Sequence, residues 1–164
     1  VIARAMILDP DFLICDEPIS ALDVSIQSQV VNLFMKIRAE RGITLLFISH
    51  DLSMVRHLCD STAVMYMGNV VEYGKNDTLF DNPLHPYTKA LIAAIPIHDP
   101  RVKREEIILE GEIPSLLQPP TGCRFHPRCP VVRPECSEKQ PELITLPDGS
   151  KAACFAVQEG RENE

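Results

Sequence analysis

Two adjacent carboxylates, Asp16 and Glu17, follow the apolar stretch FLIC. A second apolar stretch, ITLLFIS, ends immediately before His50. If both stretches are strands of one parallel sheet, these three side chains lie at its carboxyl edge, where open α/β sheets place their ligands. Consecutive strand residues point in opposite directions, so the two acids can have separate tasks. In nucleoside-triphosphate chemistry one acid would bind Mg²⁺, often through water, the other would act as general base, and His50 would reach a γ-phosphate.

Each of these features taken alone has an ordinary structural explanation. An Asp-Glu pair after apolar residues usually marks a strand leaving the core, and a single histidine after a strand is usually a turn residue. The order of features is more specific: an apolar strand, Asp-Glu-Pro, Ser-Ala-Leu-Asp, a long amphipathic stretch, an apolar strand and Ser-His-Asp. That combination indicates a nucleotide site.

The elements that would position these residues follow from hydrophobic periodicity and from stop signals. Strands alternating with helices indicate an α/β fold with a parallel sheet and crossover helices. The two apolar stretches contain so few polar residues that both strands are expected to be fully buried. The expected elements are a helix over residues 1–8, a strand over 12–15, a helix over 24–42 closed by Gly42, a strand over 43–49, a helix over 51–59 capped by Asp51, a hairpin over 61–74 turning at Gly68-Asn69, and a helix over 82–96.

The quoted motifs resemble those of ATP-binding-cassette (ABC) ATPases. LICDEP is similar to their Walker B motif, SALD to their D-loop, ISHD to their switch histidine, and VIARAMILDPDFL to the helix after their signature motif. The resemblance covers about the first 95 residues and implies part of a P-loop NTPase sheet that uses ATP and Mg²⁺. It implies that Asp16 holds Mg²⁺ through water, that Glu17 is the catalytic base and that His50 contacts the γ-phosphate. Ser20 and Asp23 would lie beside the nucleotide at the interface of two ATPase subunits.

Other motifs of that family do not occur in the 164 residues. The sequence contains no G-x-x-x-x-G-K-[ST] phosphate loop, no Q-loop and no L-S-G-G-Q signature. These motifs would precede Val1, so the chain reads as the C-terminal piece of a longer protein. We therefore expect this piece alone to be inactive and the parent to hydrolyse ATP.

The C-terminal part resembles the extension of oligopeptide and dipeptide importer ATPases. The likeness rests on NPLHPYTKALIAAIP and on EGEIPSLLQPPTGCRFHPRCP, and EPISALDVSIQ is more similar to the F-type than to the D-type subunit. The resemblance implies a prokaryotic protein on the cytoplasmic face of the membrane. Its partners would be a second ATPase subunit, transmembrane permease subunits and, indirectly, a peptide-binding protein.

Composition limits the other function classes. The net charge is -7, which argues against general binding to nucleic acid, and no apolar run approaches the roughly 20 residues of a membrane span. A change in composition predicts three segments: an ATPase domain over residues 1–96, a linker over 97–106 and a cysteine-containing, irregular extension over 107–164.

Four cysteines fall in the extension with the spacing C-x₅-C-x₆-C-x₁₇-C, at Cys123, Cys129, Cys136 and Cys154. The cytoplasmic α/β pattern argues against disulfides, and thiolates suit either zinc or an iron–sulfur cluster. The spacing lacks zinc-finger C-x₂-C pairs, although His126 could join a zinc site. The family resemblance implies a [4Fe–4S] cluster on the four cysteines. Unliganded thiols are the third possibility, but a proline-rich tail with few core residues is expected to need a metal staple.

Two functions remain open on the sequence. The first is the energy-coupling ATPase subunit of a peptide importer. The second is a metal- or cluster-binding regulatory module that retains an ATPase-like core. A phosphate loop upstream of Val1 would favour the first.

Overall fold

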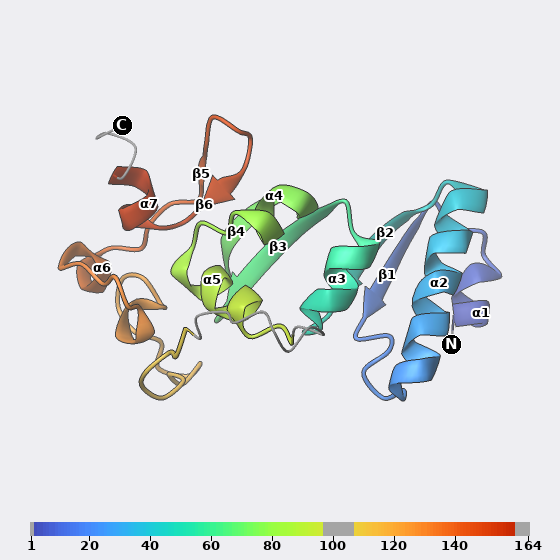
Figure 1. The fold of residues 1–164 in the computed structure, drawn as a ribbon, viewed down its shortest axis with the longest axis horizontal. Coiled ribbons are helices and arrows are strands. Elements are labelled where there is room, and N and C mark those ends of the chain that lie inside the picture. Colours follow the sequence, from blue (N-terminus) through green and yellow to red (C-terminus); the bar gives the residue numbers. More distant parts are fainter. Residues whose placement is uncertain (1, 97–106, 160–164) are drawn as a thin grey trace. The chain divides into compact units, whose positions relative to one another are not determined.

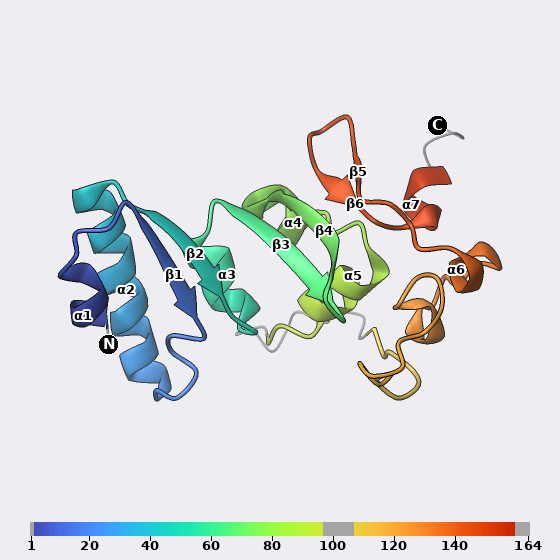
Figure 2. The same cartoon turned by 180° about the vertical axis from the view of Figure 1, so that it is seen from behind.

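The computed structural model describes residues 2–96 and 107–159, which belong to two compact units, residues 1–59 and residues 60–164. Figures 1 and 2 show their elements from opposite sides. The first unit contains α1 (Ile2–Met6), β1 (Phe12–Asp16), α2 (Val24–Arg41), β2 (Thr44–Ile48) and α3 (Leu52–Leu58). The second contains β3 (Ser61–Tyr66), β4 (Asn69–Lys75), α4 (Asn76–Asp81), α5 (Pro86–Ala93), the 3₁₀ turn η1 (His126–Arg128), α6 (Glu135–Glu138), β5 (Ile144–Thr145), β6 (Lys151–Ala152) and α7 (Phe155–Glu159).

The first unit is a parallel β-α-β arrangement, which confirms the predicted α/β class. Strands β1 and β2 pair in parallel, with Asp16 opposite Ile48, and α2 is the crossover between them (Figure 1). Cys15 and Phe34 form the centre of the small core, at 5% and 1% exposure. The Phe34 ring meets the Phe47 ring edge-on at 6.1 Å, so α2 is fixed against the sheet by aromatic packing.

The prediction that both strands are fully buried is wrong for this structure. Phe12 and Ile14 on β1 are 52% and 59% exposed, and Leu46 and Ile48 on β2 are 46% and 45% exposed. These residues alternate with the ones that pack against α2, as the period of two in a strand requires. Apolar runs indicate that both faces can be buried, but the described residues bury only one of them.

Side-chain and backbone caps define the ends of the long helix. Asp23 precedes α2 and its carboxylate accepts the Ile26 N–H at 3.0 Å. At the other end, Gly42 takes a left-handed conformation, with φ of 66°, and its N–H donates to the Arg38 carbonyl at 2.9 Å. A side-chain N-cap is worth about 1 kcal/mol, and glycine takes the left-handed C-cap without the steric cost of a Cβ. The predicted boundary at Gly42 is therefore confirmed.

The second unit is built on the predicted hairpin, whose turn differs by one residue from the prediction. Met67 and Gly68 occupy the turn with φ of 46° and 82°, as a type I′ turn requires, whereas Gly68-Asn69 was expected. The four strands have the order β3-β4-β6-β5, so a strand of the extension pairs with the hairpin. This pairing is antiparallel, with Glu72 opposite Ala152.

Aromatic packing fills the core of the second unit. Phe125 from the extension is 1% exposed, and its ring lies 5.2 Å from Tyr66, 5.5 Å from Tyr87 and 5.5 Å from His85. Burial of one phenylalanine contributes about 1.5–3 kcal/mol. The extension therefore shares the core of the hairpin and α5, and the expectation that it also needs a metal staple stays a prediction.

The compact units do not divide the chain where the composition changes. The structural boundary falls after Cys59, whereas the prediction placed the ATPase domain at residues 1–96. Residues 60–96 thus share a unit with the extension. The predicted linker, residues 97–106, lies outside the described residues, and the three-segment division of the chain stays a prediction.

Candidate functional site

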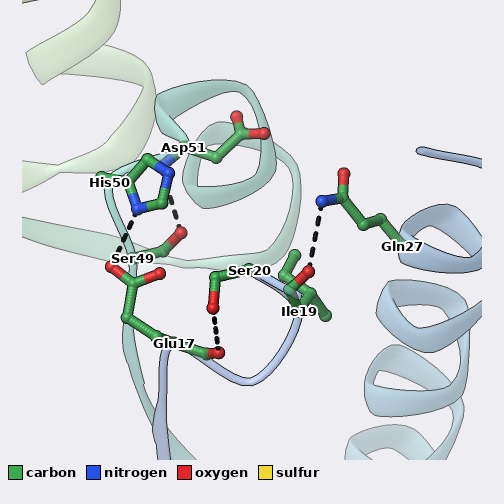
Figure 3. A network of polar contacts seen from close by, with 7 residues as sticks. All are labelled: Glu17, Ile19, Ser20, Gln27, Ser49, His50 and Asp51. Atoms are coloured by element: carbon green, nitrogen blue, oxygen red, sulfur yellow. Dashed lines mark hydrogen bonds and ion pairs between the residues drawn. The ribbon is translucent and has the colours of Figure 1, made fainter. Parts of the chain in front are cut away.

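Glu17 and His50 meet at the carboxyl ends of β1 and β2 (Figure 3). His50 Nδ1 lies 2.9 Å from Glu17 Oε1, and the Glu17 N–H donates to the Ile48 carbonyl at 2.9 Å. The His50 side chain is 78% exposed and the Glu17 side chain is 40% exposed, so both are accessible from solvent. The hydrogen bond to Glu17, followed by the attraction of its charge, raises the pKa of His50. The structure therefore brings together two of the predicted site residues as a base and an acid in contact.

The backbone at Glu17 has an unusual conformation. Its φ is 45°, in the left-handed region that costs a non-glycine residue about 1–2 kcal/mol. The Ser20 hydroxyl donates to the Glu17 carbonyl at 3.0 Å, and the β1–β2 pairing fixes the Glu17 N–H. Strained backbone of this kind is common where a side chain must have one fixed direction. Here it directs the carboxylate toward His50 (Figure 3).

Asp16 is the last residue of β1 and is exposed. Its carboxylate is a hard oxygen donor, the type of ligand that Mg²⁺ prefers. Since Glu17 follows directly, a cation held by Asp16 would lie near the Glu17–His50 pair. The donor chemistry of this edge thus fits Mg²⁺ bound through a single carboxylate and water.

Ser20 and Asp23 have local structural tasks in the turn between β1 and α2. Ser20 donates to the Glu17 carbonyl, and Asp23 caps α2 while its Oδ1 accepts the Ser25 hydroxyl at 2.7 Å. The Ser25 hydrogen bond and then the Ile26 N–H lower the pKa of Asp23, which keeps its carboxylate ionised. Both residues are exposed, so these contacts leave them accessible.

Gln27 also holds this turn, and the sequence analysis missed it. Its side-chain amide donates to the carbonyls of Ile19, at 3.2 Å, and Leu22, at 3.1 Å. A glutamine on an amphipathic helix gives no sequence signal for such a task. Its position four residues after the capping Asp23 is the one feature that could have suggested it.

The four cysteines of the extension are free thiols close enough to influence one another. Cys123, Cys136 and Cys154 are buried and Cys129 is half-buried. Burial is the main cause that raises the pKa of Cys129 to about 11, and the charges of the three other thiolates raise it further. The Cys123 N–H donates to the Cys136 carbonyl at 2.8 Å, which brings these two backbones together.

These thiols suit a soft metal in kind but are not arranged as its ligands. Among residues 2–96 and 107–159, no group of three or more His, Cys, Asp and Glu side chains has a metal-binding arrangement. The predicted metal centre at Cys123, Cys129, Cys136 and Cys154 therefore has no support from the geometry. A metal would require these side chains to reorient.

A second buried polar cluster lies in the second unit and was not predicted. Glu72 is 2% exposed, and its carboxylate accepts the N–H groups of Leu84, at 2.9 Å, and His85, at 2.8 Å. His85 is 1% exposed and its Nδ1 accepts the Tyr87 N–H at the start of α5. Burial raises the pKa of Glu72 and lowers the pKa of His85 to about 4. His85 therefore has a structural place in the core of the second unit.

Helices long and apolar enough to span a membrane are lacking in the part of the chain that the structure describes.

A family model described as "Oligopeptide/dipeptide transporter, C-terminal region" matches residues 71–136. Among curated proteins, the putative oligopeptide transport ATP-binding protein YkfD of Bacillus subtilis is 52% identical over 165 residues, covering 99% of this chain and 50% of the relative. The oligopeptide transport ATP-binding protein OppF of Salmonella typhimurium is 56% identical, over 87% of this chain and 43% of the relative. The dipeptide transport ATP-binding protein DppF of Haemophilus influenzae is 50% identical, over 95% of this chain and 48% of the relative. The chain thus spans about half the length of these relatives.

Proposed function

Because this chain belongs to the family of oligopeptide and dipeptide transport ATP-binding proteins, we propose that it is part of an ATP-hydrolysing subunit that drives peptide import. The observation that carries the proposal is the 2.9 Å contact between Glu17 and His50 at the carboxyl ends of two parallel strands. The names of two relatives, OppF and DppF, agree with the prediction of an F-type subunit.

The residue roles follow from the chemistry of this edge. Mg²⁺ and ATP, when bound, supply the phosphoryl group and neutralise its charge. Asp16 would hold the cation through water. Glu17 would accept a proton from the attacking water at its carboxylate oxygen, and His50 would donate a hydrogen bond to the γ-phosphate. The raised pKa of His50 favours its charged form, which suits contact with an anion.

Ser20 and Asp23 would face a second ATPase subunit beside the nucleotide. Support comes from their exposure and from the turn that connects them to Glu17 through the Ser20 hydrogen bond. The complete transporter would also contain transmembrane permease subunits. This protein would bind to them at the cytoplasmic face of the membrane. A peptide-binding protein would take part indirectly, by delivering the substrate. The alternative of a metal-binding regulatory module has no support in the comparisons.

The proposed function is tested on the full-length protein, assembled with its permease subunits and its partner ATPase in lipid vesicles. We expect ATP hydrolysis in the presence of Mg²⁺ and uptake of a short peptide that stops when ATP is replaced by a non-hydrolysable analogue. Absence of ATP hydrolysis in the complete assembly would refute the proposal.

The four extension cysteines are proposed to bind one soft metal centre, a [4Fe–4S] cluster with zinc as the alternative. The proposal is supported by the grouping of four thiols whose charges influence one another, three of them buried, and it requires their side chains to reorient from the arrangement of the described residues. The centre would have a structural or sensing role, since Glu17 and the other predicted catalytic residues lie in the first unit.

Metal analysis of the full-length protein, purified without oxygen, distinguishes the alternatives. We expect about four iron atoms per chain and broad visible absorption, and Cys129→Ser should lower the iron content. Because Phe125 packs against Tyr66 and Tyr87 through contacts that involve no cysteine, this variant should keep its fold by circular dichroism. Cys59→Ser, a half-buried thiol of the first unit, is the control. One zinc per chain would replace the cluster proposal, and no bound metal would reject both.

A further inference from the structure

The turn between β1 and α2 is held from the helix side by one side chain. Gln27 lies on the first turn of α2, where its backbone N–H donates to the Asp23 carbonyl at 2.9 Å. Its side-chain amide donates to the Ile19 carbonyl at 3.2 Å (Figure 3). It also donates to the Leu22 carbonyl at 3.1 Å. An amide nitrogen carries two hydrogens, so one side chain can satisfy both acceptors.

The geometry of these contacts requires a donor at residue 27. Both partners are carbonyl oxygens, which accept and cannot donate, so the amide nitrogen and not its oxygen must face them. Ile19 is 3% exposed, and its carbonyl accepts the Leu22 N–H at 3.1 Å as well as the Gln27 amide, so the amide is the contact that joins this turn to α2. A side chain of equal length without hydrogen-bond donors would therefore release the turn from the helix.

The same turn is connected to Glu17 on its other side. The Ser20 hydroxyl and the Ser20 N–H both donate to the Glu17 carbonyl, at 3.0 Å and 3.4 Å. Glu17 has a positive φ, so its side-chain direction depends on contacts that maintain this conformation. The hydrogen bond from Gln27 to Ile19 and the hydrogen bonds from Ser20 to Glu17, joined by the peptide bond between Ile19 and Ser20, thus connect α2 to Glu17.

We propose that Gln27 is a positioning residue for Glu17: it fixes the Ile19–Leu22 turn on α2 and thereby holds the Glu17 carboxylate against His50. This inference deepens the proposed function and rests on it where it concerns ATP hydrolysis. A competing explanation is that Gln27 only stabilises the start of α2, as the Asp23 cap does.

The test uses Gln27→Met in the full-length protein. Methionine has a similar length and helix propensity but has no donor for the two carbonyls. Gln29→Met is the matched control, because Gln29 lies on the same helix and is exposed. We expect Gln27→Met to lower kcat for ATP hydrolysis roughly ten-fold, since small misplacements of catalytic groups are costly, with KM for ATP within about two-fold of wild type. The control should match wild type in both.

A second readout does not depend on hydrolysis. The pKa of His50, followed by NMR with the His50 signal assigned by His50→Gln, is raised by Glu17. If Gln27 positions Glu17, the His50 pKa in Gln27→Met should fall toward 6.5, while helix stability alone would leave it unchanged.

The two readouts separate failure of the inference from failure of the proposed function. Wild-type kcat together with an unchanged His50 pKa in Gln27→Met would overturn the inference. A wild-type protein that hydrolyses no ATP would refute the proposed function, and the His50 pKa would then decide on the positioning role alone. A loss of folding in Gln27→Met, seen by circular dichroism, would assign the residue to stability and overturn the inference.

Discussion

Replacing Glu17 with glutamine in the full-length protein should preserve ATP binding and lower turnover by about 10²–10⁴-fold, the usual effect of removing a general base. Glutamine matches the size of glutamate but does not accept a proton from water. Nucleotide binding depends on other groups, so a fluorescent ATP analogue should bind with nearly unchanged affinity. Steady-state phosphate release measures the turnover.

The matched control is Glu40→Gln, because Glu40 is exposed on α2 and is paired only loosely with Lys36, at 3.8 Å. Its turnover should equal that of wild type. The Glu17 contact raises the pKa of His50, so Glu17→Gln should also bring that pKa down toward its ordinary value. Turnover of Glu17→Gln within a few-fold of wild type would contradict the assignment of Glu17 as general base.

The meeting of Glu17 and His50 was predictable because two local signals combine with a topological rule. Apolar runs that end in polar residues mark strand ends, and parallel pairing places the ends at one edge. The register of Asp16 opposite Ile48 then brings Glu17 near His50. The hydrogen bond itself and the positive φ of Glu17 were not predictable, because a short-range pattern carries no information on the direction of a side chain in a turn.

The packing of the extension could not be predicted from the sequence, for a different reason. Phe125 is a single aromatic residue among prolines, and its partners Tyr66 and Tyr87 lie tens of residues earlier. A two-residue strand such as β6 has too few residues to show alternation, and it forms because β4 offers an edge. Judged by its own apolar content, the tail lacked a core, whereas in the structure the hairpin supplies one.

One face of β1 and β2 is apolar but exposed, so the sequence pattern predicts more burial than the described residues provide. Phe12, Ile14, Leu46 and Ile48 have the composition of a strand buried on both faces, as in parallel sheets covered by helices on both sides. The chain spans about half the length of its relatives. The apolar pattern therefore predicts strands that can be buried on both faces. Residues 2–96 and 107–159, which the structure describes, cover only one of these faces.

Acidification should destabilise the second unit through His85. Its imidazole is 1% exposed and burial lowers its pKa to about 4, whereas an unfolded histidine titrates near 6.5. As the pH falls from 6.5 toward 4, the unfolded state binds a proton that the folded state does not, so stability is fully present above pH 6.5 and is lost across this window. At 1.36 kcal/mol per pKa unit, the loss is about 3 kcal/mol.

Glu72, which accepts the His85 N–H, acts in the opposite direction. Burial raises its pKa, so the folded state binds a proton before the unfolded state does, and stability increases as the pH falls toward 4.5.

The difference between wild type and His85→Asn isolates the histidine, because asparagine can still cap α5 by accepting the Tyr87 N–H, while the backbone contact with Glu72 stays. Urea unfolding of this chain, followed by tyrosine fluorescence, reports the second unit, since its three tyrosines are Tyr66, Tyr73 and Tyr87. We expect a lower stability of His85→Asn at pH 7 but a smaller loss between pH 6.5 and 4 than in wild type. His57→Asn, on α3 of the first unit, is the control and should keep the wild-type dependence, because tyrosine fluorescence reports the second unit. Equal slopes in wild type and His85→Asn would show that His85 titrates normally in the folded state.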